Sequence, residues 1–355
     1  MKIANWRVGD LEIKLPIVQG GMGVGISLAG LAAAVANCGG LGIISGVEPG
    51  FSRADYSANK RRANALGMVE QLERARELSP HGVIGVNIMV ALNNYAEMVQ
   101  AAVQGRADII FSGAGLPLDL PELTAGSSVK LAPIVSSARA AALICRRWQK
   151  RYGRVPDAIV LEGPLAGGHL GYSREELQTE PPQLEQMIPE AVQAIAPFAT
   201  GSRPIPVIAG GGLWTGQDIA RVLQAGATAA QLGSRFVPTV ECDASLAFKQ
   251  EYLRATPEDI VLIKSPVGLP GRAIRNAFLE KVKQGETAPV RCAYNCLQPC
   301  TRQTAPYCIA AALTNAQQGQ LEHGFAFAGV NAWRAERIEP VKQVIDELVA
   351  GIEKA

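Results

Sequence analysis

The chain has 355 residues, 48% of them hydrophobic, which is enough to bury one barrel-sized core and a smaller appendage. Its 34 Lys and Arg residues nearly balance 32 Asp and Glu residues, and the formal charge of +2 gives no electrostatic reason to expect a nucleic acid or an anionic membrane as partner. The composition therefore favours chemistry on a small-molecule substrate.

The first residues, MKIANWRVGDLEIK, carry charged side chains where a signal peptide needs an uninterrupted apolar stretch, so we expect a cytoplasmic protein. The apolar segment 28–47 is long enough to span a bilayer. Asn37 and the pair Gly39 and Gly40 divide it into a helix followed by a strand. We therefore interpret it as part of a barrel core and expect no membrane association.

Eight short apolar runs rich in β-branched residues follow along the chain, and each ends in glycine or polar residues. Alanine-rich helical runs such as 137–153 and 215–227 separate several of them. The predicted strands are LPIVQGG (15–21), LGIISGV (41–47), VIGVNIMV (83–90), DIIFSGAG (108–115), VKLAPIVSS (129–137), AIVLEGP (158–164), IPVIAGGG (205–212) and AAQLGSRF (229–236). This alternation predicts parallel strands joined by helical crossovers.

The predicted strands are continuously apolar, which indicates a sheet covered on both faces. We therefore predict an α/β fold, a (β/α)8 TIM barrel with a smaller C-terminal extension on the substrate side. An open doubly wound sheet is the alternative. Against it, the glycines of QGGMGVGIS (19–27) lack the GxGxxG spacing of a dinucleotide-binding loop.

Two glycine-rich loops follow the seventh and eighth predicted strands, where barrels commonly bind a phosphate group with loop amides. Gly211 and Gly212 allow close approach of the backbone, and Gly233 with the Ser234 hydroxyl completes the cradle. The alternative is that these glycines only form tight turns. Because the two loops are adjacent in a barrel, the phosphate interpretation is favoured.

The glycine-rich segments carry a family resemblance that extends from residue 16 to residue 334. The motifs are QGGMG (19–23), GVNIMV (85–90), SGAGLP (112–117), AGGHLG (166–171), IAGGG (208–212) and QLGSRF (231–236). In this order they resemble the FMN-dependent nitronate monooxygenases, formerly 2-nitropropane dioxygenases, and the flavin-containing enoyl-ACP reductases. The resemblance implies an FMN-dependent oxidoreductase.

Several residues at the predicted strand ends suit a flavin. Gly21 and Met22 present backbone amides and a soft side chain to a flavin ring, and Asn87 offers the paired donor and acceptor that the pyrimidine edge requires. Lys130 is predicted to place positive charge near that edge, or else to be a solvated surface lysine. By the resemblance, the predicted cofactor-binding set also includes Glu162, Gly167, Gly168, Gln231 and Leu232.

His169 follows Gly167 and Gly168 in the loop after the sixth predicted strand. A neutral imidazole there abstracts a proton, and a protonated one donates a proton to a product anion. In the family that the motifs resemble, the histidine of this motif is the proposed acid or base, and that role is assigned to His169. The alternative is a histidine hydrogen-bonded for packing alone.

The reaction is less determined, because monooxygenases and reductases share the flavin cradle. Nitronate or nitroalkane oxidation is the first hypothesis, and an enoyl-ACP or other enoyl or quinone reductase that uses NAD(P)H as co-substrate is the second. Glu162 is more similar to the reductases, while Leu165 departs from both groups, which usually have an acidic residue there. A phosphate-binding barrel isomerase and a non-catalytic flavin-binding protein are the remaining alternatives.

Four of the seven cysteines, Cys292, Cys296, Cys300 and Cys308, fall within seventeen residues. Disulfides rarely persist in the cytoplasm, so we predict that these thiols bind a metal, an iron-sulfur cluster before zinc. Their spacing matches neither a zinc ribbon nor a ferredoxin. Packing cysteines or redox-active thiols are the alternatives.

We divide the chain into an FMN-binding barrel (1–255), a substrate-side extension with the cysteines (256–334) and a C-terminal helix (335–355). In the extension, Arg272 and Arg275 either meet an anionic substrate or face solvent. The last segment carries an apolar stripe with helical spacing, which suits docking on the barrel or on a second subunit of a homo-oligomer.

Overall fold

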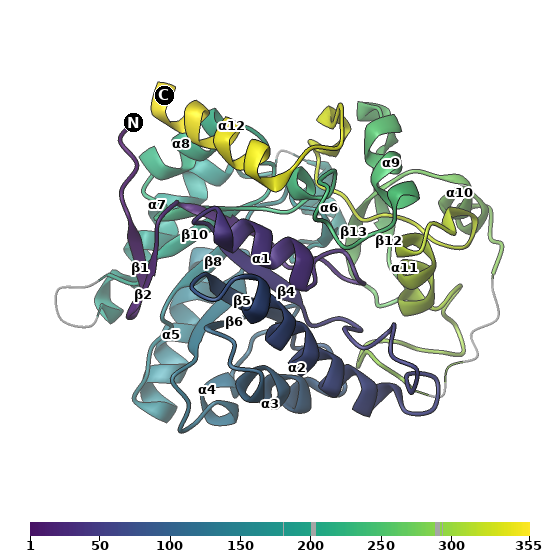
Figure 1. Cartoon of the computed structure of the whole chain (residues 1–355), viewed down its shortest axis with the longest axis horizontal. Helices are drawn as coiled ribbons and strands as arrows, with labels where there is room; N and C mark the ends of the chain where they lie inside the picture. The colour runs from purple at the N-terminus through teal and green to yellow at the C-terminus, as the bar shows by residue number, and fades with distance from the viewer. Residues whose placement is uncertain (180, 200–203, 288–291, 293) are drawn as a thin grey trace.

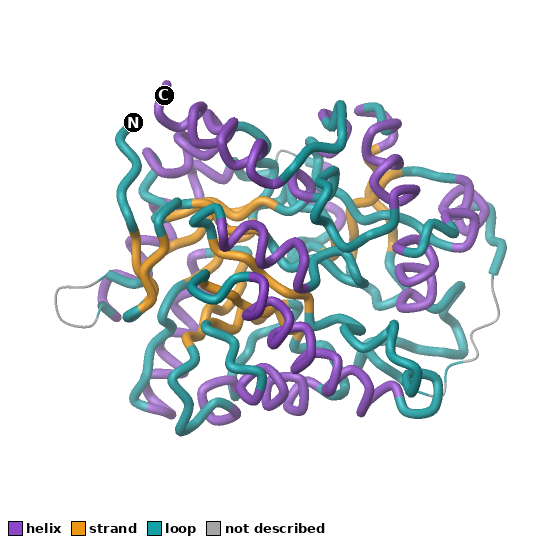
Figure 2. The backbone as a smooth tube through the Cα atoms, viewed as in Figure 1, coloured by secondary structure: helices purple, strands orange, loops and turns teal. Residues whose placement is uncertain are grey.

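The computed structural model describes the whole chain except residues 180, 200–203, 288–291 and 293. Eight parallel strands close into a barrel in the order β10-β11-β3-β4-β5-β6-β7-β8, at the centre of Figure 2. They are β3 (Ile17–Gln19), β4 (Leu41–Ser45), β5 (Val83–Met89), β6 (Ile109–Gly113), β7 (Lys130–Val135), β8 (Ile159–Glu162), β10 (Val207–Gly210) and β11 (Ala229–Leu232). Each lies within a predicted strand, so the predicted TIM barrel is confirmed.

Helices cover the outside of the barrel and bury an apolar layer against the strands. They are α1 (Ala29–Asn37), α2 (Lys60–Leu78), α3 (Tyr95–Gln104), α4 (Leu120–Leu123), α5 (Ala138–Tyr152), α7 (Leu184–Ile195), α8 (Gly216–Gln224) and α12 (Val341–Lys354). Several begin at a side-chain cap that satisfies a first-turn amide; Ser137, for example, accepts from the Ala140 N–H. Continuous apolar strands and amphipathic helices thus build the two layers of the fold.

The C-terminal helix α12 packs against α8 and α1, beside the N-terminus of the chain (Figure 1). Gly216 of α8 and Gly351 of α12 allow this close crossing, since a Cβ on Gly216 would lie 2.6 Å from the Gly351 Cα atom. The apolar stripe of α12 is buried at Val341, Ile345, Leu348 and Ile352. The barrel and a second subunit were the two predicted docking surfaces for this helix. The structure shows the helix docked on the barrel.

A two-stranded hairpin, β1 (Trp6–Val8) and β2 (Leu11–Ile13), closes the amino-terminal end of the barrel. Gly9 turns the chain with a φ of 60°, as a two-residue hairpin loop requires. Trp6, Val8 and Ile13 pack with the residues that fill the barrel interior, including Phe111. This end of the barrel is therefore plugged, and a ligand site belongs at the opposite rim.

The extension lies beyond the carboxyl-terminal rim, at the right of Figure 1. Its antiparallel sheet joins β12 (Ile260–Lys264) and β13 (Pro270–Ile274) to β9 (Gly168–His169), which belongs to the loop after β8. The remaining helices are α6 (Arg174–Gln178), α9 (Leu246–Arg254), α10 (Ala277–Lys283) and α11 (Ile309–Gln317). Among the described helices, none is long and apolar enough to cross a membrane.

Candidate active site

A cavity of about 450 Å³ opens between the carboxyl ends of the barrel strands and the extension. The loops that follow all eight barrel strands contribute to its wall, and the segments 296–297, 309–313 and 327–331 complete it from the extension. Active sites of TIM barrels are built at this rim because parallel strands bring all their carboxyl ends together.

The cavity brings together His169 and twelve of the thirteen predicted cofactor-binding residues. They are Gly21, Met22, Asn87, Glu162, Gly167, Gly168, Gly211, Gly212, Gln231, Leu232, Gly233 and Ser234. All of these residues line one cavity. The ligand group that each of them binds stays a prediction.

Two of the glycines leave no room for a side chain. A Cβ on Gly21 would lie 2.5 Å from the Asn87 Cβ atom, and a Cβ on Gly167 would lie 2.5 Å from the carbonyl carbon of Ala328. Bare backbone at these positions keeps the Asn87 side chain at the cavity and lets the loop after β8 pack on the extension.

The loops after β10 and β11 form a cradle of backbone amides. Gly211 and Gly212 have φ values of 113° and 79°, a region that favours glycine. Among the described residues, no acceptor pairs with the backbone N–H groups of Gly211, Gly212 and Gly233. The Ser234 hydroxyl accepts the Gly329 N–H at 2.8 Å and lines the cavity beside these amides. Unpaired donors at a cavity wall suit a phosphate group.

His169 lies in the short strand β9, paired with Gly271 of β13, and its ring lines the cavity. The Nε2 atom is 2.7 Å from Oγ of Ser265, and the Phe327 ring packs edge-on with centroids 5.0 Å apart. When Nε2 carries the proton, it donates to Ser265 and leaves the Nδ1 lone pair to accept a proton. Ser265 is therefore a positioning residue for the imidazole.

Burial lowers the pKa of His169 to about 4. The imidazole is consequently neutral at physiological pH, which is the state of a general base. A neutral imidazole has a free lone pair on one nitrogen. His169 can therefore accept a proton without first being deprotonated.

Glu162 ends β8 at the same cavity, and burial raises its pKa to about 7. Among the described residues, its carboxyl group forms no ion pair, while the Tyr172 hydroxyl donates to the Glu162 carbonyl oxygen at 2.7 Å. The cavity therefore holds a second group that titrates close to neutrality.

The raised pKa of Glu162 predicts how stability depends on pH. The folded chain binds the Glu162 proton more tightly than the unfolded chain, so this contribution to the unfolding free energy is present below about pH 4.5 and is lost as pH rises through about 7. In denaturant titrations at several pH values, we expect the unfolding free energy of Glu162→Gln to fall less over this pH range than that of the wild type. Glu175→Gln on exposed α6 is the matched control, and identical pH profiles for wild type and Glu162→Gln would contradict the assignment.

The prediction for Lys130 is wrong. Lys130 is the first residue of β7 and lies at the plugged end of the barrel, where its Nζ atom is 2.5 Å from Oδ1 of Asp10. The hydrogen bond from Lys130 also lowers the pKa of Asp10. A residue at the start of a parallel strand lies a full strand length from the carboxyl rim, so Lys130 closes the hairpin and cannot reach the cavity.

The structure does not support the predicted metal centre. Cys292, Cys296, Cys300 and Cys308 are free thiols, and among the described side chains no three His, Cys, Asp or Glu residues form a metal-binding group. The segment is instead fixed to the loop after β5 by backbone hydrogen bonds, such as the one from the Asn93 N–H to the Cys296 carbonyl at 3.0 Å. Burial and the nearby Glu48 raise the pKa of the Cys296 thiol to about 12.

The two arginines of the extension have structural partners. Arg272 is buried and donates from Nη1 to the Pro164 carbonyl oxygen at 2.8 Å, which holds the loop that carries His169. Arg275 pairs with Asp259 at 2.9 Å. Neither side chain lines the cavity, so an anionic substrate does not meet them in the described structure.

Sequence reasoning missed four polar groups of the site: Ser265, Asn331, the backbone of Gly329, and Glu48. Asn331 donates to the Gly212 carbonyl oxygen at 2.6 Å and so fixes the phosphate loop. Glu48 lines the cavity from the loop after β4. The sequence offered a signal for Glu48 alone, since this residue directly follows a predicted strand. The other three groups contact partners that lie about one hundred residues away in the sequence.

A barrel plugged at one end, with a cavity at its open rim lined by glycine-rich loops and a histidine, is the arrangement on which TIM-barrel enzymes build their active sites. The nitronate monooxygenase family model matches residues 6–351, and the chain belongs to this family. It is an oxidoreductase of a flavin-dependent family, which confirms the predicted resemblance.

Individual relatives agree with this assignment. A probable nitronate monooxygenase of Staphylococcus haemolyticus is 25% identical over 97% of this chain and 96% of its own. A (3aS,4S,5R,7aS)-5-hydroxy-7a-methyl-1-oxo-octahydro-1H-indene-4-carboxyl-CoA dehydrogenase of Mycobacterium tuberculosis is 27% identical over 78% of this chain and 68% of its own. Among solved structures, FabK from Thermotoga maritima superposes with a TM-score of 0.74 at 26% identity, covering 96% and 94% of the two chains.

Proposed function

We propose that the protein binds FMN and oxidises nitronates and nitroalkanes, with His169 as the proton acceptor. The observation that carries this proposal is the placement of a neutral imidazole in one cavity with an unpaired amide cradle. Membership of the nitronate monooxygenase family supports the reaction class.

The residues of the cavity fit FMN. The amides of Gly211, Gly212 and Gly233 with the Ser234 hydroxyl would hold its single phosphate, and Asn87 would hydrogen-bond the polar edge of its ring. Bound FMN would supply the redox chemistry between the substrate and dioxygen. The glycine-rich loops would exclude bulky side chains from the space that the cofactor needs.

The chain itself supplies proton transfer. His169 accepts the α-proton of a neutral nitroalkane at Nδ1, and the electron pair of the broken C–H bond stays on the substrate as the nitronate. Ser265 holds the imidazole through Nε2, and Phe327 packs on its ring, so that the basic nitrogen keeps its orientation. A substrate supplied as the nitronate needs no such proton transfer.

We expect the purified protein to release stoichiometric FMN when it is denatured, because the cradle offers room for one phosphate and the chain has no dinucleotide fingerprint. Chromatography of the supernatant identifies the flavin. Gly212→Val, which places a side chain where φ is 79° and Leu165 lies close, should lose most of it, and Gly126→Ala in a remote turn is the control. Release of FAD, or a colourless protein that never binds flavin, would contradict the proposal and favour the isomerase alternative.

An NAD(P)H-dependent enoyl reductase is the second candidate, since the FabK structure covers nearly the whole fold and Glu162 replaces the glutamine expected of monooxygenases. The two functions differ in what reduces the flavin. Anaerobic titration with a nitronate, NADH and NADPH, followed by the flavin absorbance, separates them: bleaching by the nitronate alone supports the monooxygenase. Bleaching only by a nicotinamide, with reoxidation by an enoyl thioester, supports the reductase.

A further inference from the structure

A buried carboxylate, Glu48, lines the cavity and has no part in the chemistry assigned to His169. Only 5% of the residue is exposed. Its backbone has a φ of 52°, which glutamate rarely adopts. The chain therefore holds a charged side chain at this wall at a cost in both desolvation and backbone energy.

Neutral donors hold one oxygen of this carboxylate. The Tyr56 hydroxyl donates to Oε2 at 2.6 Å, and Nδ2 of Asn64 donates to the same atom at 2.8 Å. Among the described residues, no Lys or Arg pairs with Glu48, and Oε1 accepts no hydrogen bond. Glu48 lines the cavity, and Oε1 is the carboxylate oxygen that the described residues leave without a hydrogen bond.

Among the described residues that line the cavity, none is Lys, Arg or Asp. Met89, Leu92, Leu297 and Leu313 line this side of the cavity. Cys296 lines the same cavity from the extension. A carboxylate oxygen in an apolar wall is strongly stabilised by a cation or a hydrogen-bond donor, since a ligand that neutralises it removes an unpaired buried charge.

Glu48 and His169 face the cavity from opposite sides. Glu48 follows β4, the second barrel strand, and His169 follows β8, the sixth, so three strands lie between them on either side of the closed ring of eight. The amide cradle follows β10 and β11, which lie between β8 and β3 in the ring. A substrate long enough to cross the cavity from His169 would bring its far end to the carboxylate.

We propose that Glu48 is a specificity-determining residue that binds an ammonium group, or another cationic donor, at the end of an apolar substrate chain. This inference rests on the proposed function, because it names a feature of the substrate that the same cavity accepts. Tyr56 and Asn64 position the carboxylate through Oε2 and leave Oε1 to the substrate.

Ligand binding tests the subsite without turnover. The holoenzyme is titrated with n-alkylammonium ions, n-alkanols and n-alkanoates of matched length, and the flavin absorbance reports the dissociation constants. We expect the best ammonium ion to bind at least roughly tenfold more tightly than the alkanoate of equal length, as a charge-assisted hydrogen bond provides. Glu48→Gln, of equal shape and no charge, should bring the two constants within roughly twofold of each other.

Glu48→Asp provides a second and independent variant. It withdraws the carboxylate by one methylene, so the preferred alkylammonium should become one methylene longer while the preference for cations remains. Glu70→Gln, at the exposed ion pair with Arg53, is the control and should bind like the wild type. A wild type that binds alkanoates as tightly as ammonium ions, or a Glu48→Gln variant that keeps the preference, would overturn the proposal.

The two proposals fail separately. Bleaching of the flavin by an uncharged nitronate tests the proposed function and does not depend on Glu48 binding a cation. The ratio of ammonium to alkanoate affinity tests the subsite and does not depend on any turnover. A protein that bleaches with the nitronate but shows no cation preference refutes only the subsite.

Discussion

His169→Ala is expected to lower turnover of neutral nitroalkanes by roughly two to four orders of magnitude while FMN stays bound. Among the described residues that line the cavity, His169 is the one histidine, so the variant removes the imidazole that would accept the α-proton. Steady-state oxygen consumption measures the loss, and the flavin content measured after denaturation confirms that the cofactor remains.

The same variant should lose far less activity on a preformed nitronate, because that substrate has already given up its α-proton. The wild type should keep its turnover of nitroalkanes from neutral pH down to about pH 4 and lose it below, as the imidazole becomes protonated. His323→Ala, at an exposed histidine of the extension, is the matched control. Equal losses on nitroalkane and nitronate would reject the base role and leave His169 as a binding or packing residue.

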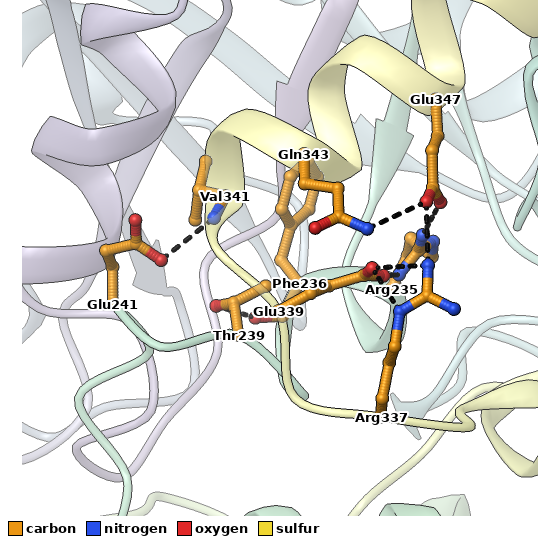
Figure 3. A network of polar contacts seen from close by, with 9 residues as sticks. All are labelled: Arg235, Phe236, Thr239, Glu241, Arg337, Glu339, Val341, Gln343 and Glu347. Carbon is orange, nitrogen blue, oxygen red and sulfur yellow. Dashed lines mark hydrogen bonds and ion pairs between the residues drawn. The ribbon is translucent and has the colours of Figure 1, made fainter.

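Glu339→Gln is expected to lower the unfolding free energy by about 3–5 kcal/mol, since it removes the buried one of the two carboxylates that pair with the buried Arg235 guanidinium. Arg235 donates from Nη1 to Glu339 at 2.9 Å and from Nη2 to Glu347 at 2.8 Å, and both partners are also bound by Arg337 (Figure 3). Arg235 and Glu339 are only 9% and 6% exposed at their side chains. Urea titration of the holoenzyme measures the loss.

The network links the candidate phosphate loops to the C-terminal helix. Arg235 follows Ser234 in the loop after β11, and its guanidinium lies 5.3 Å from the centre of the Trp214 ring, which lines the cavity. We therefore expect Glu339→Gln to weaken FMN retention as well. The exposed pair Lys342–Asp346 on the same helix is the control, and Asp346→Asn should cost less than about 1 kcal/mol.

A double-mutant cycle distinguishes the ion pair from general damage. If Arg235→Met combined with Glu339→Gln recovers much of the stability lost in Glu339→Gln, the cost arises from a buried guanidinium that has lost its buried carboxylate partner. Additive losses would contradict this account and assign the effect to packing.

The sequence by itself determined the barrel and most of the candidate cofactor site. Apolar strands that alternate with helices require a parallel sheet covered on both faces, and a closed barrel brings the carboxyl ends of all strands to one rim. Residues directly after a strand, such as Gly21, Gly211 and His169, therefore had to share one cavity. Their neighbourhood follows from topology, without knowledge of any long-range side-chain contact.

Only the tertiary structure decided what lies at the other end of the strands and across the cavity. Lys130 begins its strand, as its place in the predicted strand 129–137 already implied, and only the structure shows its partner at that end, Asp10 of the hairpin. Ser265 reaches His169, and Gly329 reaches Ser234, across contacts that no local pattern encodes. The density of cysteines predicted a metal. In the structure, backbone hydrogen bonds hold their segment against the loop after β5, and Cys296 lines the cavity near Glu48. Hydrogen bonds between such distant loops set the direction of side chains, and no local pattern encodes them.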